Sequence, residues 1–165
     1  MVSTTLTNLI TNGTFESGGS GSLTGWTGAA YGDGSYRTTA LHYKFGSYSL
    51  RLTSGDVTDD DAEVYQTKTI TSGTRYIYMS VWARGTATST TQAMVALYDG
   101  ATLRSNITSS LTTDWKRFSV VFSKTTGSIT PKIYVNSASG YRVDAYFDGV
   151  EVIDITDLYT EMGFS

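Results

Sequence analysis

A chain of 165 residues with a net charge of −3 and no cysteine has room for one domain with a substantial core, and it excludes disulfide bonds. The acidic balance argues against a nucleic-acid partner, because binding phosphates needs a basic surface. No apolar run approaches the roughly 20 residues of a membrane helix, so we expect no membrane insertion, and the first ten residues lack the charged and apolar regions of a secretory signal peptide.

The composition favours strands over helices. Charged residues make up 16% of the chain, below the average of about 25%. Thr, Ser, Gly and Tyr take their place, and with Pro131 as the single proline, glycine must supply most of the turns. We therefore expect an all-β protein.

The first 70 residues predict short strands between long loops. Residues 7–15 are expected to form a short strand that enters a turn at Asn12-Gly13. Further strands are expected at residues 46–52 and 64–70, and loops at residues 18–25, 29–37 and 56–63.

The strongest strand of the first half covers residues 75–84, where side chains alternate strictly. Ile77, Met79 and Val81 lie on one face, and the opposite face carries Trp82 and Arg84. Such alternation predicts that one face meets a core and the other meets water.

The second half continues this pattern, with a strand at residues 93–98 that ends at the turn signal Asp99-Gly100 and a weakly pairing run at 103–111. Residues 114–154 form the stretch around which the chain is organised, because they hold three strand-like runs, at 117–122, 132–136 and 145–153. Residues 154–165 are expected to form one short helical turn. About ten short strands with frequent turn signals predict a two-sheet antiparallel β-sandwich or jelly roll.

Four groups of segments resemble one family. They are NLITNGTFE (8–16) followed by GW (25–26); GSYSL (46–50); YIYMSVWAR (76–84); and TDWKRF (113–118) with YFDGV (146–150). In this order they resemble the carbohydrate-binding modules of families 4, 9 and 22, which share a galactose-binding-domain-like jelly roll. The resemblance implies a single domain over residues 1–165, with its core at 8–154 and a short tail at 155–165.

The segment DGVEVIDITDLY (148–159) carries a second resemblance. It is similar to carbohydrate-binding-like domains at the ends of bacteriophage tail and minor structural proteins. This similarity implies a virion or another extracellular assembly as the setting, with other virion proteins as partners.

The first resemblance also implies a structural calcium ion that ties the first strand to the last. The implied ligands are the carboxylates of Glu16 and Asp148, with backbone carbonyls near Lys44 and Ser47. Calcium takes roughly 6–8 oxygen ligands and accepts carbonyls beside carboxylates. The alternative is that Glu16 and Asp148 are ordinary turn and cap residues.

Modules of families 4 and 22 bind glycans in a cleft across one sheet, and the resemblance implies such a site on the water-facing side of the middle strands. Aromatic rings can cover the apolar face of a sugar, while amide and guanidinium groups bond its hydroxyls. The candidate residues are Gln66, Trp82, Arg84, Tyr98, Lys132, Tyr134 and Asn136. The alternative is that Trp82 and Tyr134 belong to the core, since a shift of one residue exchanges the two faces of a strand.

No catalytic residue is expected. His42 is the only histidine and has no obvious partner. The acidic run from Asp59 to Asp61, with Glu63, lacks the spacing of an EF-hand and is expected to be a solvated face. No pair of carboxylates can be placed across a cleft, as glycoside hydrolysis requires.

We therefore expect a non-catalytic carbohydrate-binding module, not an enzyme. Its expected ligand is a polysaccharide or a host cell-surface glycan, and its expected setting is a phage tail or virion surface. The alternative is a structural jelly-roll domain that serves virion assembly and binds no sugar. Both hypotheses are compatible with a homo-oligomer.

Overall fold

The computed structural model describes residues 6–30, 34–55, 61–86, 93–106, 111–125, 127–137 and 142–163. Asp59 and Asp60, two members of the acidic run, lie outside the described residues.

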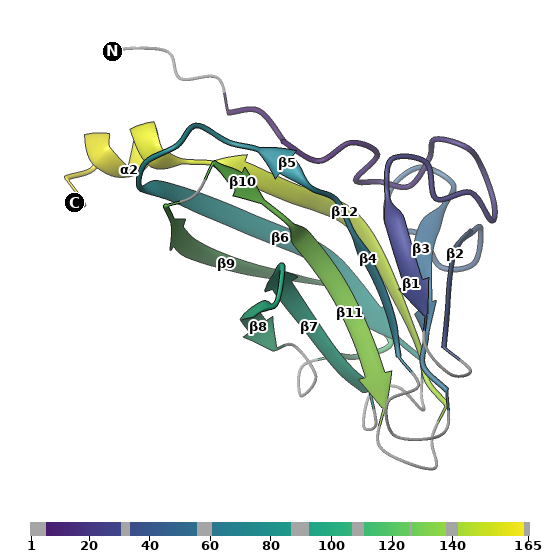
Figure 1. Cartoon of the computed structure of the whole chain (residues 1–165). Helices are drawn as coiled ribbons and strands as arrows, with labels where there is room; N and C mark the ends of the chain where they lie inside the picture. Colours follow the sequence, from purple (N-terminus) through teal and green to yellow (C-terminus); the bar gives the residue numbers. More distant parts are fainter. Residues whose placement is uncertain are drawn as a thin grey trace.

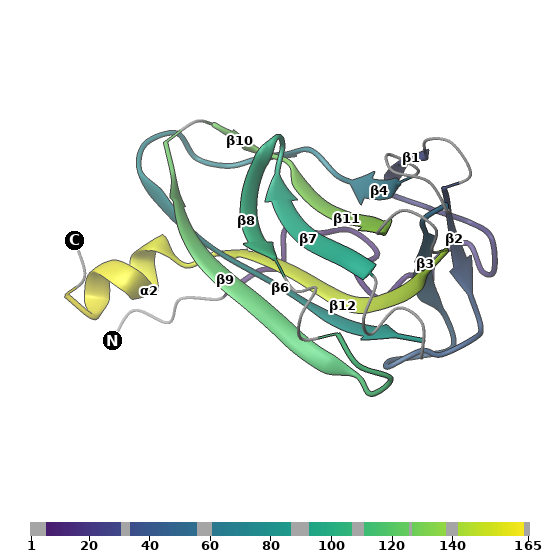
Figure 2. The same ribbon diagram turned by 90° about the horizontal axis from the view of Figure 1, so that it is seen from below.

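The described residues form a two-layer β-sandwich (Figures 1 and 2). We call the layer that faces the viewer in Figure 1 the front sheet. Its strands follow the order β1 (Thr27–Ala30), β4 (Ala62–Tyr65), β11 (Pro131–Ser137), β7 (Ala93–Asp99) and β8 (Thr102–Asn106). Behind it lies the back sheet, with the order β2 (Ser35–Thr39), β3 (Ser49–Thr53), β12 (Asp144–Asp154), β6 (Arg75–Gly85) and β9 (Lys116–Lys124). All pairs are antiparallel, so the expected all-β jelly roll is confirmed.

Three short elements complete the fold. Strand β5 (Lys68–Thr69) pairs with β10 (Ser128–Ile129), and helix α2 (Thr156–Glu161) follows β12. The helix projects from one end of the sandwich (Figure 2) and confirms the helical turn expected in the tail. No helix in the described part of the chain is long and apolar enough to cross a membrane.

The core lies between the sheets and follows the predicted alternation. Ile77, Met79 and Val81 of β6 are fully buried, as are Ile133 and Val135 of β11. Burying a side chain of this size stabilises the fold by about 1.5–3 kcal/mol relative to leaving it exposed. The faces of both strands that lie opposite the residues expected to face water therefore meet the core, as the alternation predicts.

Strand β12 organises the back sheet, because it pairs with β3 on one side and with β6 on the other. Its register against β6 shifts in the middle, where Gly149 has a φ of 56° and forms part of a bulge. The N-terminal segment runs beside this strand. The amide of Asn8 donates to the carbonyl of Val150 at 3.0 Å and accepts from the N–H of Val152 at 2.9 Å. These bonds fix the N-terminal segment to the centre of the back sheet.

The first strands differ from the expectation. The sequence predicts a loop over residues 29–37, whereas β1 and β2 extend into this range and β2 pairs along β3. Both are edge strands, TGAA and SYRTT, without the apolar alternation that marks a half-buried strand. Conversely, the strand expected at residues 7–15 is reduced to a single bridge between Asn8 and Ile153.

Candidate functional site

Two tyrosines stand on the outer face of the front sheet, on the neighbouring strands β7 and β11. Tyr98 lies opposite Lys132, and Tyr134 lies opposite Glu63 of β4. The tyrosine rings meet edge to face, with centroids 5.8 Å apart. Lys132 Nζ lies 2.7 Å from Glu63 Oε2 and 5.7 Å from the centre of the Tyr98 ring. We call these four residues the tyrosine platform.

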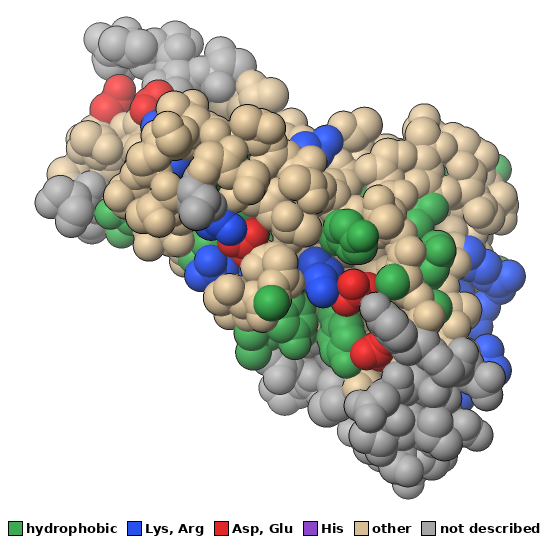
Figure 3. Space-filling view, in the orientation of Figure 1, with side chains coloured by type: hydrophobic (Ala, Val, Ile, Leu, Met, Phe, Trp, Pro, Cys, Tyr) green, Lys and Arg blue, Asp and Glu red, His purple; other side chains and the backbone are tan. Residues whose placement is uncertain are grey.

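The platform combines apolar and polar groups on one surface. Figure 3 views the front sheet from outside and shows hydrophobic, basic and acidic side chains side by side across its middle strands. Glu63 was missed as a site residue, because the sequence places it at the end of an acidic loop. The signal that could have found it is the alternation of residues 62–65, which buries Ala62 and Val64 and leaves Glu63 on the outer face.

The hydroxyl of Tyr134 is held in place from two sides. It accepts a hydrogen bond from Asn136 Nδ2 at 3.1 Å and also hydrogen-bonds to Asp61. Burial, followed by the bond to Asp61, raises the pKa of Tyr134 well above its usual value. Tyr134 is therefore a neutral phenol with a fixed ring at all ordinary pH values.

Gln66 and Asn136 do not face water as the sequence predicted. Gln66 is 4% exposed, and its amide is engaged by the backbone of Thr11, which donates at 3.2 Å and accepts at 2.6 Å. Asn136 is 6% exposed and donates to the hydroxyl of Tyr134, two residues before it on β11. Gln66 thus fastens the N-terminal segment to the end of β4 and is not part of the platform.

Trp82 and Arg84 do not join the platform either. They lie on β6, in the back sheet, and the sandwich separates them from Tyr98 and Tyr134. The expectation of one shared cleft is therefore wrong, because alternation tells which way a side chain points but not which sheet its strand joins. The outward direction itself is correct, since neither Trp82 nor Tyr134 is in the core.

The side chains of Trp82 and Arg84 contact the loop at residues 40–48, which lies over the outer face of the back sheet. Lys44 Nζ is 4.4 Å from the centre of the Trp82 ring. Arg84 Nη1 lies 3.2 Å from Nδ1 of His42, and burial together with this guanidinium lowers the pKa of His42. His42 is thus an uncharged part of the loop, and among the described residues it bonds to no carboxylate that would make it a catalytic base.

Asp148 is fully buried at the bulge of β12, and backbone amides surround its carboxylate. Oδ2 accepts hydrogen bonds from the N–H groups of Lys44 and Phe45, both at 2.8 Å, and Oδ1 accepts one from Gly149 at 2.7 Å. Burial raises the pKa of Asp148 to about 6 despite these bonds, and the charge of Glu16 adds to the rise.

Glu16 holds the same loop from the N-terminal segment. Its carboxylate accepts hydrogen bonds from the N–H of Ser47 at 3.0 Å and from that of Tyr48 at 2.8 Å. Gly46 packs against this carboxylate, and a Cβ there would stand 2.4 Å from the carboxyl carbon. The two carboxylates therefore bind the loop at residues 44–48 through its backbone N–H groups.

These contacts fit the expected calcium ion only in part. Two carboxylates converge on one loop, and no cationic side chain of the described residues is bonded to either, which suits a divalent cation. The carbonyls of Lys44 and Ser47 do not suit it. In a trans peptide the C=O points opposite to the next N–H, and the N–H groups of Phe45 and Tyr48 point at the carboxylates. The described residues contain no cluster of three or more acidic, His or Cys side chains placed to hold a metal ion.

Comparison with known proteins connects this fold to a family. A family model described as "Carbohydrate binding domain" (CBM_4_9) matches residues 7–144. No curated protein sequence matches the chain.

Three solved structures have a similar fold. TmCBM61 in complex with β-1,4-galactotriose has a TM-score of 0.66 at 16% identity, covering 90% of this chain and 99% of that one. The CBM22-1 xylan-binding domain of Paenibacillus barcinonensis Xyn10C has a TM-score of 0.60 at 18% identity, covering 87% and 92%. The enzymatically active domain of tailspike protein 4 of bacteriophage CBA120 has a TM-score of 0.59 at 18% identity, and the match covers 88% of this chain but only 21% of the tailspike.

At such identities the structural neighbours show the fold alone, whereas the family match spans most of the sequence. The protein is a member of the carbohydrate-binding domain family CBM_4_9.

Proposed function

We propose that the protein binds a polysaccharide chain without cleaving it, and that the tyrosine platform is the binding surface. The observation that carries this proposal is the pair of tyrosine rings, fixed edge to face on the outer side of a carbohydrate-binding sandwich. A sugar ring lies with its apolar C–H face on one of these rings, because that contact buries area on both sides.

The polar part of the platform suits the hydroxyl groups of a neutral glycan. Lys132 offers ammonium hydrogens and Glu63 offers carboxylate oxygens, and each neutralises the charge of the other. Tyr134 adds a phenol with a fixed direction. A strongly acidic polysaccharide is disfavoured, because Asp61 and Glu63 together outweigh the single charge of Lys132.

The same contacts favour binding over catalysis. Hydrolysis of a glycosidic bond uses two carboxyl groups that flank it. Glu63 is engaged by Lys132, and Asp61, the residue before β4, is engaged by Tyr134, so the two acids come from one short segment and do not flank a bound sugar from two strands.

The setting we propose is a phage tail or another virion surface, where the domain recognises a host cell-surface glycan beside other virion proteins. The tailspike among the structural neighbours supports this setting, as does the resemblance of the closing strand to phage tail domains. Several copies on one particle would raise a modest single-site affinity by avidity.

Affinity electrophoresis in gels that contain β-1,4-galactan, xylan or a bacterial cell-wall polysaccharide tests the platform. We expect a retarded wild-type protein, and an affinity about tenfold lower in Tyr134→Ala and in Tyr98→Ala, which each lose one aromatic contact. Tyr43→Ala is the matched control, because Tyr43 is a 49% exposed tyrosine in the loop over the back sheet. Retention by none of the polysaccharides, together with a stable oligomer in solution, would instead support a structural role in assembly.

We also propose that the carboxylates of Glu16 and Asp148 bind a structural calcium ion. The convergence of two acids on residues 44–48 supports this, and the directions of the Lys44 and Ser47 carbonyls oppose a role for these two groups as ligands. A cation held there would tie the N-terminal segment, the loop and β12 together, which raises stability by mass action.

A further inference from the structure

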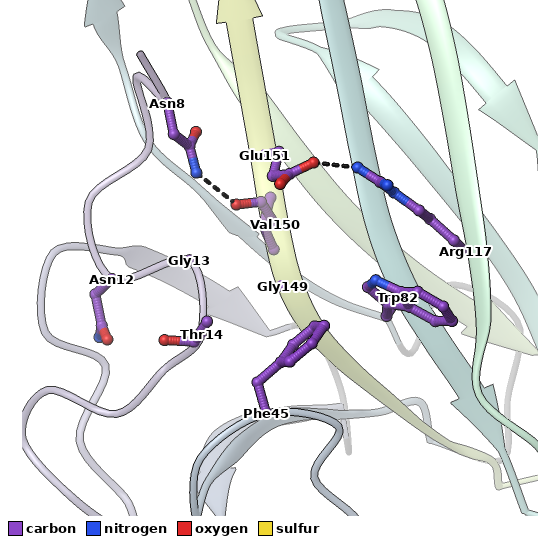
Figure 4. Close-up of a pocket in the computed structure, with 10 residues that line it drawn as sticks. All are labelled: Asn8, Asn12, Gly13, Thr14, Phe45, Trp82, Arg117, Gly149, Val150 and Glu151. Atoms are coloured by element: carbon purple, nitrogen blue, oxygen red, sulfur yellow. Dashed lines mark hydrogen bonds and ion pairs between the residues drawn. The ribbon is translucent and has the colours of Figure 1, made fainter. Parts of the chain in front are cut away.

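A pocket of about 510 Å³ opens on the outer face of the back sheet, on the side opposite the platform. Its volume lies within the range of about 300–1,000 Å³ that is typical of small-molecule sites. Figure 4 shows Asn8, Asn12 and Thr14 of the N-terminal segment along one side and Trp82 and Arg117 along the other, with β12 between them.

The apolar wall of the pocket consists of two aromatic rings that both pack against a glycine. Phe45, which is 42% exposed, meets Trp82 edge to face with centroids 6.2 Å apart. Gly149 lies between them, and a Cβ at this position would stand 2.6 Å from the Phe45 ring and 3.1 Å from the Trp82 ring. The two rings occupy the space that a side chain at this position would need, so only glycine lets them pack against β12 here.

The polar wall offers hydrogen-bonding groups that the protein itself does not use. Glu151 binds Ser80 and Arg117 through Oε2, and Arg117 donates through Nη2 and Nε, also to Ser80. Within the described residues, Oε1 of Glu151, Nη1 of Arg117 and the indole N–H of Trp82 have no hydrogen-bond partner. The pocket thus presents one acceptor and two donors beside an apolar surface.

The side of the pocket formed by the N-terminal segment is held in place by hydrogen bonds. Asn12 accepts from the N–H of Ser17 at 2.9 Å and donates to the carbonyl of Thr24 at 2.9 Å, and Asn8 is bonded to β12. The pocket is therefore formed in advance, and little ordering entropy is lost when a ligand enters.

The charged residues that line the pocket favour a neutral ligand. Arg117 and Glu151 form an ion pair without net charge, and the ammonium of Lys44, which is not part of the lining, lies over the face of the Trp82 ring. Lys44 covers the face of the Trp82 ring, and Phe45 contacts the same ring edge to face. A ligand in the pocket therefore contacts the N–H edge of the indole and the side of the Phe45 ring that is turned away from Trp82.

We propose that this pocket is a second carbohydrate site, which takes a single neutral pyranose residue such as a chain end or a branch. The choice of a sugar as ligand rests on the proposed function, whereas the pocket itself is independent of the platform. A pyranose offers an apolar C–H face for Phe45 and hydroxyls that both donate and accept, which matches the unused groups of Trp82, Arg117 and Glu151.

The indole N–H signals of ¹⁵N-labelled protein test this proposal. The chain has three tryptophans, and the platform has none, so the Trp82 signal reports on the pocket alone. The spectrum of Trp82→Phe assigns this signal by its loss. We expect methyl glycosides of galactose, glucose, xylose or N-acetylglucosamine to shift it in a saturable way, and methyl glucuronide to bind no more tightly than its neutral counterpart.

Phe45→Ala tests the apolar wall without removing the reporter. We expect an affinity about tenfold lower, from the loss of roughly one aromatic contact. Phe45 is half exposed, so the variant is expected to fold. Tyr134→Ala is the control and should leave the titration of the Trp82 signal unchanged, because Tyr134 lies on the other sheet.

Failure of this proposal and failure of the platform give different results. A Trp82 signal that no glycoside shifts, or an unchanged affinity in Phe45→Ala, overturns the second site even if polysaccharide gels retain the protein. A saturable shift in a protein that no polysaccharide retards supports the pocket and contradicts the platform.

Discussion

At the scale of single residues, polar side chains of the same type serve different purposes, and their neighbours decide which. Tyr134 presents its ring on the platform, and Asn136, two residues further along β11, donates a hydrogen bond to the hydroxyl of that ring. Gln66, which the sequence groups with them, is buried and bonded to Thr11. The sequence could not separate these roles, because the burial of a polar side chain depends on segments that are distant along the chain.

The calcium ion proposed above would change how the ionisation of Asp148 affects stability. Without a cation, burial raises its pKa to about 6, from a usual value of 3.8. Between these two pH values the folded state binds more protons than the unfolded state, so the free energy of unfolding falls as pH rises, by about 3 kcal/mol in total. A bound calcium ion favours the ionised carboxylate, which lowers this pKa and reverses the slope.

Denaturant unfolding from pH 4 to pH 7, in excess chelator and in excess calcium, measures both slopes. Asp148→Asn provides the reference, because it removes this one titration and keeps the other carboxylates. We expect the wild type minus Asp148→Asn difference to fall with rising pH in chelator and to increase with pH in calcium, together with a higher melting temperature in calcium. Identical curves in the two buffers would show that Asp148 binds no calcium.

At the scale of strands, alternation identifies the faces of the long central strands but not their partners. The inward row of β6 and that of β11 follow directly from the sequence, because period-two burial is local. The assignment of β6 to the back sheet, away from β7 and β11, depends on pairings between residues far apart in sequence. For this reason the predicted site is divided between two sheets, although the directions of its aromatic side chains are correct.

A substitution at the bulge in β12 is expected to affect both the stability of the fold and glycoside binding in the pocket. Gly149→Ala places a Cβ on a residue with a φ of 56° and pushes it toward the rings of Phe45 and Trp82. We expect a loss of about 1–3 kcal/mol in the free energy of unfolding. We also expect the glycoside-dependent shift of the Trp82 signal to disappear, while retention in polysaccharide gels persists.

Gly100→Ala is the control for backbone strain. Gly100 has a φ of 60°, but a Cβ there would have no neighbour within 4 Å. This variant should lose only the strain part of the stability and should keep the glycoside response. Equal losses in both variants would mean that the rings beside Gly149 adapt to the added methyl group.

At the scale of the whole molecule, an ion cluster around the buried Asp99 joins the two sheets. Asp99, at the end of β7, accepts a hydrogen bond from the N–H of Thr130 at 2.9 Å and pairs with Arg104 of β8 and with Lys124 of β9. Since β9 belongs to the back sheet, the pair with Lys124 connects the layers at their edge. Burial alone would raise the pKa of Asp99, but Lys124, Thr130 and Arg104 outweigh it and lower the pKa.

Asp99→Asn should therefore destabilise the sandwich, by about 2 kcal/mol near neutral pH, since it leaves two cations without their carboxylate. Because the pKa of Asp99 is lowered on folding, its contribution is present above about pH 4 and is lost as pH falls further, so the variant should resemble the wild type in strong acid. Urea unfolding at several pH values measures this loss of stability.

Glu151→Gln is the comparison, because it breaks a half-exposed ion pair within one sheet and should cost less than about 1 kcal/mol. A larger loss in Glu151→Gln would contradict the importance of the connection between the layers.

The tyrosine platform and the pocket beside Trp82 lie on opposite faces of the sandwich. A protein with a sugar site on one face binds one polysaccharide chain at a time, whereas a protein with sites on both faces can bridge two chains. With both sites occupied, each monomer would crosslink two glycan molecules. Many monomers would then crosslink a polysaccharide solution into a network or aggregate cells that carry the glycan, without any oligomer of the protein.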